Sequence, residues 1–159
     1  MVVSVVKFFP PDCEGGTQQI AGFTDTENLL FFFGQNNVIR SDGTEVGTFE
    51  ILTEASSIVP NSIEAPDVAV VNNNLFFSNF NDENGNEPWI SDGTAEGTTV
   101  LKDINLDGES TPLDFLAVGD KVFFTADDGV NSRELWVSDG TEVGTQLTRN
   151  IQDVESPIN

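Results

Sequence analysis

The sequence of 159 residues contains no histidine, no tyrosine, one cysteine and only six lysine or arginine residues. Without histidine the commonest general base is missing, and neither a Ser–His nor a Cys–His nucleophile pair can form. The single Cys13 excludes an intramolecular disulfide and a cysteine-rich zinc site. Nothing among the carboxylates marks out the pair that a glycosidase needs. We therefore expect no enzymatic activity.

The charge is strongly one-sided, because 27 acidic residues face six basic ones and the formal net charge is −21. Such a surface repels phosphate backbones and anionic lipids, so we expect neither nucleic acid nor membrane insertion. The charge favours a basic protein partner, divalent cations or a high-salt environment, and a solvated surface without a partner is the alternative. The opening MVVSVVKFFPP has no basic start and no cleavage site, so we interpret it as a strand and see no signal peptide.

One eight-residue motif, called the repeated phrase below, occurs three times in this chain. SDGTEVGT occurs at 41–48 and at 138–145, and SDGTAEGT occurs at 91–98. Asp-Gly is a strong tight-turn signal, and the flanking residues alternate as strands do. The phrase is therefore predicted to join two strands of a hairpin. The alternative is that its aspartates line a functional site; these are Asp42, Asp92 and Asp139.

A phenylalanine doublet precedes each phrase, at spacings of 45 and 47 residues: Phe31-Phe32, Phe76-Phe77 and Phe123-Phe124. Periods in this range indicate repeated supersecondary units. The doublet strand is apolar on both faces, as a strand covered by two layers would be. No segment sustains a helical period.

The sequence thus predicts a single all-β domain over 1–159, built from three tandem four-stranded antiparallel repeats. The repeats span about 10–52, 53–102 and 103–149, with residues 2–9 as an extra strand. In the third repeat the strands are expected at 113–118, 121–126, 133–138 and 144–149. Repeats of four strands in 45–50 residues agree with β-propeller-like blades, but three of them in about 150 residues also fit a β-trefoil, and a β-prism is a weaker alternative.

The segment RELWVSDGTEVGT, at 133–145, resembles the ELWxxDGT repeat of long acidic bacterial proteins, many of them cell-surface or secreted. The second repeat keeps Glu87, Trp89 and SDGTAEGT but has Pro88 where the family has leucine. The first keeps only the doublet and SDGTEVGT. The resemblance covers about residues 20 to 149 and implies propeller blades.

Three groups of residues are candidates for binding. Trp89 and Trp136 are expected to pack between neighbouring repeats, and a sugar-stacking platform is the alternative. The string DINLDGESTPLD has the spacing of a calcium loop, although the usual Glu at position 12 and the flanking helices are missing; its candidate ligands are Asp103, Asn105, Asp107 and Asp114. The aligned loops 81–87 and 127–134 are rich in Asn and acidic residues, and we expect these to bond turn backbones; they include Asp82, Asn84, Asn86, Glu87, Asp127, Asp128, Asn131 and Glu134.

Three blades are fewer than the four to eight of a usual propeller, and an uncovered edge strand invites pairing. Residues 3–9 are a surplus strand, so we expect Val3, Val5 and Lys7 to contact another copy or a larger assembly. The predicted function is a non-catalytic structural or interaction subunit of a virion or an extracellular, cell-surface assembly. A glycan-binding module is the alternative, and a calcium-stabilised export module is a third reading.

Overall fold

The computed structural model describes residues 22–34, 37–52 and 67–149. These residues form three four-stranded antiparallel sheets, each with its strands in chain order, and no helix. None of them forms a helix long and apolar enough to cross a membrane. We name the sheets blade 1, blade 2 and blade 3. Blade 1 holds β1 (Gly22–Asp25), β2 (Leu30–Phe33), β3 (Val38–Ser41) and β4 (Phe49–Leu52). Blade 2 holds β5 (Val68–Val71), β6 (Asn74–Asn81), β7 (Gly85–Ser91) and β8 (Thr98–Val100). Blade 3 holds β9 (Leu113–Val118), β10 (Lys121–Asp127), β11 (Arg133–Ser138) and β12 (Gln146–Arg149).

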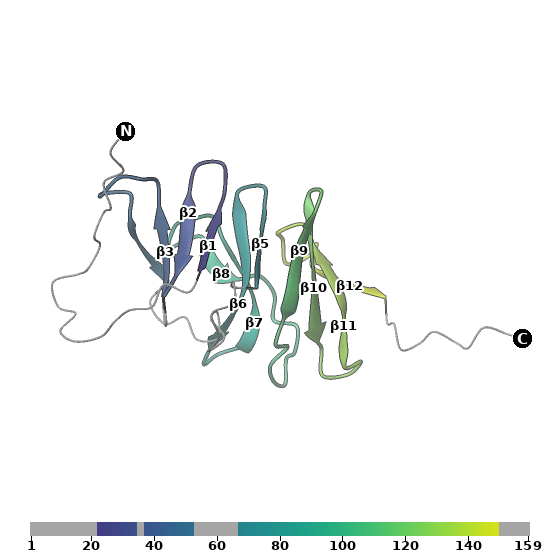
Figure 1. The fold of residues 1–159 in the computed structure, drawn as a ribbon. Helices are drawn as coiled ribbons and strands as arrows, with labels where there is room; N and C mark the ends of the chain where they lie inside the picture. The colour runs from purple at the N-terminus through teal and green to yellow at the C-terminus, as the bar shows by residue number, and fades with distance from the viewer. Residues whose placement is uncertain (1–21, 35–36, 53–66, 150–159) are drawn as a thin grey trace, which may run out of the picture.

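The blades follow one another in a row, with blade 2 between the other two (Figure 1). One apolar cluster joins blade 1 to blade 2, and a second joins blade 2 to blade 3. The all-β, four-stranded repeat architecture is therefore confirmed. The trefoil alternative is wrong, because the sheets are open and do not close into a barrel. The prism is wrong as well, because blade 2 is packed on both of its faces.

The phenylalanine doublet of blade 2 shows how the sequence produces this stacking. Phe76 belongs to the cluster shared with blade 3, while Phe77 belongs to the cluster shared with blade 1. Successive side chains of a strand point to opposite faces, so two adjacent phenylalanines serve two junctions. Their exposed fractions are 1% and 0%. Full burial of each ring contributes roughly 1.5–3 kcal/mol to the free energy of unfolding.

The expected strands of the third repeat are present, and β12 begins two residues later than expected. The reason is that Thr145 still belongs to the preceding turn, where its N–H donates to the carbonyl of Glu142 and its Oγ1 donates to the carbonyl of Thr141. Residues 2–9, the expected extra strand, lie outside the described residues.

The repeated phrase does join the third and fourth strands of each blade, as predicted. In blade 3, Oδ1 of Asp139 accepts from the N–H and the hydroxyl of Thr141, at 2.9 and 2.7 Å. The hydroxyl of Thr141 accepts from the N–H of Gly144 at 2.9 Å. Equivalent bonds with nearly equal lengths recur in the other two blades. These hydrogen bonds, led by the threonine hydroxyl, lower the pKa of Asp139. Each aspartate is thus used by its own turn.

Candidate functional site

A buried carboxylate on β7 organises the loop that the sequence marked as a calcium candidate. Glu87 is 0% exposed, and its carboxylate accepts from the N–H groups of Ile104 at 2.9 Å and Ser110 at 3.0 Å. The Ser110 hydroxyl donates to it at 2.6 Å, and the N–H of Asn105 lies at 3.4 Å. The loop therefore points hydrogen-bond donors at an anion, whereas a calcium loop points oxygens at a cation. Burial raises the pKa of Glu87 even against these four donors.

The candidate calcium ligands lie around this loop and have other partners. Oδ2 of Asp103 accepts from the side-chain amide of Asn84 at 2.9 Å, and Oδ2 of Asp114 accepts from the hydroxyl of Thr125 at 3.2 Å. The side-chain amide of Asn105 donates to the carbonyl of Glu109 at 3.2 Å, and its Oδ1 accepts from the N–H of Asp107 at 3.4 Å. Within the described residues, no group of three or more His, Cys, Asp or Glu side chains could hold a metal. Asp103, Asp107 and Asp114 therefore do not come together as a ligand set.

The Asn- and Asp-rich loops bond turn backbones, as expected. Oδ1 of Asp128 accepts from the N–H groups of Val130 at 2.9 Å and Asn131 at 2.7 Å, and the latter bond is the main cause of its lowered pKa. In the aligned loop, Oδ1 of Asn81 accepts from the N–H of Asn84 at 2.7 Å. Glu87 also accepts from backbone N–H groups, but these belong to the next connection along the chain and not to its own hairpin turn.

Both tryptophans pack between blades. Trp89 is 8% exposed in the cluster of blades 1 and 2, and Trp136 is 7% exposed in the cluster of blades 2 and 3. Their indole N–H groups have no hydrogen-bond partner among the described residues. The packing interpretation is confirmed, and the platform alternative is wrong for these two side chains, because neither ring is open to a ligand.

Blade 3 carries an apolar face on the side away from blade 2. Leu116, Phe123 and Val137 are direct cross-strand neighbours and therefore share a face. Leu116 is 62% exposed and Val118, on the same side of β9, is 53% exposed. The residues of blade 2 that correspond to Leu116 and Phe123 are Ala69 and Phe76, which are 6% and 1% exposed. We call this surface the blade 3 end face; it consists of Leu113, Leu116, Val118, Lys121, Phe123, Thr125, Asp127, Arg133, Leu135 and Val137.

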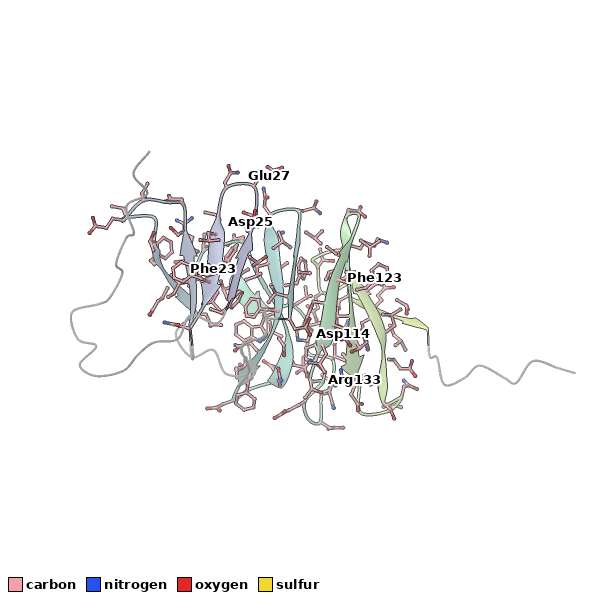
Figure 2. All side chains as sticks on the ribbon, viewed as in Figure 1. Phe23, Asp25, Glu27, Asp114, Phe123 and Arg133 are labelled. Atoms are coloured by element: carbon pink, nitrogen blue, oxygen red, sulfur yellow. The ribbon has the colours of Figure 1, made fainter. Side chains whose placement is uncertain are left out.

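Blade 1 carries the complementary face at the other end of the row. Phe23 is 63% exposed, and its ring lies 6.2 Å from that of its cross-strand neighbour Phe32. Leu30 is 38% exposed, whereas Leu75, its counterpart in blade 2, is 0% exposed. We call this surface the blade 1 end face; it consists of Phe23, Asp25, Leu30, Phe32, Ile39, Ser41 and Glu50. Figure 2 labels Phe23 and Asp25 on blade 1, and Phe123 and Arg133 on blade 3.

Charge differs between the two end faces. Lys121 and Arg133 lie on the blade 3 end face, where the guanidinium of Arg133 donates to the hydroxyls of Thr125 at 3.2 Å and Thr111 at 2.8 Å. Asp25 and Glu50 lie on the blade 1 end face. Asp127, the cross-strand neighbour of Arg133, also lies on the blade 3 end face, and the carboxylate of Asp114 accepts from the hydroxyl of Thr125 there. The blade 3 end face therefore carries both signs of charge, whereas the charged residues named on the blade 1 end face are acidic.

The interaction residues predicted from the sequence are Val3, Val5 and Lys7, which lie outside the described residues, and the two tryptophans, which pack between blades. The end faces are not among them. The sequence does contain a signal for them. A doublet strand that is apolar on both faces needs a covering layer on each side, and the first and last repeats each have only one neighbouring repeat to supply one. One face of each is therefore left to be covered by something else.

No protein-family model matches this chain, and no curated protein matches it either. The resemblance to ELWxxDGT repeats stays a prediction.

Proposed function

We propose that this chain is a non-catalytic structural subunit that acts by docking its end faces onto protein in a larger assembly. The observation that carries the proposal is the exposure of Leu116 and Phe23, at 62% and 63%. Both are large apolar side chains on faces whose counterparts in blade 2 are buried under a neighbouring blade. Exposed apolar surface of this kind is typical of protein interaction sites.

The acidic surface and the resemblance to repeats of surface proteins support an assembly such as a virion coat or a cell-surface layer. A charge of −21 keeps such a subunit soluble before it docks. The glycan-binding alternative required exposed indole rings, and Trp89 and Trp136 are both buried. We therefore do not propose it.

The proposal is tested by size fractionation of extracts from the source cells or particles that express tagged variants. We expect the wild-type chain to fractionate with a large assembly, and the double variant Leu116→Glu with Phe23→Glu to leave it. Leu106→Glu is the matched control, because Leu106 is 83% exposed and lies on neither end face. Equal fractionation of all three proteins would show that the end faces do not dock.

A further inference from the structure

We infer that the partner is a second copy of this chain, docked head to tail with its blade 1 end face on the blade 3 end face of the first copy. This inference rests on the proposed function and names the occupant of the same surfaces. The two junctions inside the chain show how one blade of this sequence covers the next.

The two internal junctions share one contact. A Cβ atom built on Gly93 of blade 2 would lie 3.5 Å from Cζ of Phe31 in blade 1. A Cβ atom built on Gly140 of blade 3 would lie 3.6 Å from Cζ of Phe76 in blade 2. In both cases the glycine of an SDGT turn lies against the first phenylalanine of the preceding doublet. The junction is therefore a repeated, specific geometry.

Both halves of this contact are unused at the ends of the row. Gly43 is the equivalent turn glycine of blade 1, and no atom of the described residues lies within 4 Å of its Cβ position. Phe123, the equivalent doublet residue of blade 3, is partly exposed, whereas Phe31 and Phe76 are 0% and 1% exposed. Docking a second copy head to tail would bring Gly43 of one copy against Phe123 of the other. That contact would repeat the geometry already present twice.

The serine before the turn glycine agrees with this reading. Ser91 and Ser138, which precede the turns of blades 2 and 3, are both 0% exposed. Ser41, in blade 1, is partly exposed. The three serines make the same bond to a threonine hydroxyl, at 2.7, 2.8 and 2.7 Å. The turns are alike, so the difference in exposure comes from the blade that precedes each one.

The charges of the two end faces favour pairing of unlike faces. The blade 3 end face carries Lys121 and Arg133 beside Asp127, so it offers basic groups to the acidic blade 1 end face. Two blade 1 end faces together would bring the carboxylates of Asp25 and Glu50 against carboxylates. Like charges brought together across an interface cost free energy and suppress that arrangement. Self-pairing of identical faces would also fail to reproduce the internal junction.

Two copies bring six blades together, which lies within the four to eight of closed propellers. A head-to-tail contact forms a ring when its rotation closes and an open filament when it does not. Repetition of a single junction geometry around six blades uses both end faces of both copies. We therefore expect a closed dimer.

The test uses purified full-length chain and sedimentation equilibrium. Wild type is expected at twice the 17.2 kDa chain mass. Leu116→Glu blocks one end face and Phe23→Glu blocks the other, and each is expected to raise the dissociation constant at least roughly tenfold. When the two variants are mixed, the unblocked face of each can still pair, so we expect a 1:1 heterodimer. Leu106→Glu should behave as wild type, and Val118→Glu, also on the blade 3 end face, replaces Leu116→Glu if that variant does not fold.

Each other result overturns the inference. If only one of the two blocking variants dissociates, identical faces pair with each other. If both variants dissociate but the mixture does not pair, the contact is not head to tail. A wild-type monomer whose size is unaffected by either variant means that the faces are covered by another part of the chain or by a different protein. The last two outcomes leave the proposed function standing if the extract experiment still depends on the end faces.

Discussion

The hydroxyl of Ser110 donates to the carboxylate of Glu87 at 2.6 Å, which ties β7 to a loop 23 residues further along the chain. The same carboxylate accepts the N–H groups of Ile104 and Ser110. These bonds hold the connection between blades 2 and 3. One side chain of blade 2 is therefore bonded at several points to the connection that leads to blade 3.

We predict that Glu87→Gln lowers the free energy of unfolding by about 1–3 kcal/mol, because an amide has one acceptor oxygen and its NH₂ group would face buried donors. Urea denaturation monitored by tryptophan fluorescence measures the loss. Glu83→Gln is the matched control, since Glu83 is exposed on the turn of the same hairpin. An equal midpoint for Glu87→Gln and its control would contradict the anchoring role.

The raised pKa of Glu87 predicts a particular pH dependence. At pH values above 4.5, the ordinary pKa of a glutamate, the carboxyl of Glu87 keeps its proton better in the native state than in the unfolded state. The contribution of Glu87 to the free energy of unfolding therefore falls as pH rises through its native pKa. Asp128 acts in the opposite direction, because its native pKa lies below the ordinary aspartate value of 3.8. Its contribution to the free energy of unfolding is lost as pH falls through that lower pKa. Stability measured at stepped pH should decline less steeply above pH 4.5 in Glu87→Gln than in wild type. Parallel curves would contradict this.

Trp136 is predicted to stabilise the chain by packing alone. Trp136→Ala should lower the free energy of unfolding by about 3–5 kcal/mol, as the loss of a large buried aromatic side chain does. Trp136→Phe should cost less, because it keeps an aromatic ring and removes an indole N–H that has no partner among the described residues. Thermal denaturation followed by circular dichroism compares the two variants. A loss from Trp136→Phe as large as that from Trp136→Ala would indicate a bond made by the indole nitrogen.

Much of the fold could be predicted because its determinants are local. The strands and turns of each blade follow from alternation and from the SDGT hydrogen bonds, which involve residues two to four apart. The partners of Glu87 could not be predicted, since they lie 17 to 23 residues away. A hint existed, because Glu87 is two residues before Trp89 and so shares its core-facing side of the strand. A carboxylate on a buried face must find donors, but the sequence does not say where.

The SDGT turn gives a further prediction. Oγ1 of Thr145 donates to the carbonyl of Thr141 at 2.7 Å and lies 2.7 Å from the hydroxyl of Ser138, and the residue is 0% exposed. Thr145→Val keeps the shape of the side chain and removes both hydrogen bonds, so it should lower the free energy of unfolding by about 1–3 kcal/mol. Thr99→Val, at an exposed position of β8, is the matched control and should have little effect. Equal chemical-denaturation midpoints for the two variants would show that the turn does not depend on this hydroxyl.

Self-association is predicted to strengthen as salt is raised. Two copies that each carry a formal charge of −21 repel each other over the range of the Debye length, which shrinks from about 10 Å at 0.1 M to about 3 Å at 1 M ionic strength. Screening also weakens the attraction of Lys121 and Arg133 for the acidic end face. Exposed ion pairs contribute only about 0–1 kcal/mol each, so the relief of the overall repulsion should dominate.

The measurement is sedimentation equilibrium of the wild-type chain in sodium chloride between these two concentrations, and the dissociation constant should fall. Leu106→Glu should follow the wild-type curve, because it leaves both end faces intact. A dissociation constant that rises with salt would mean that charge pairs, rather than the apolar side chains around Phe23 and Leu116, hold the copies together.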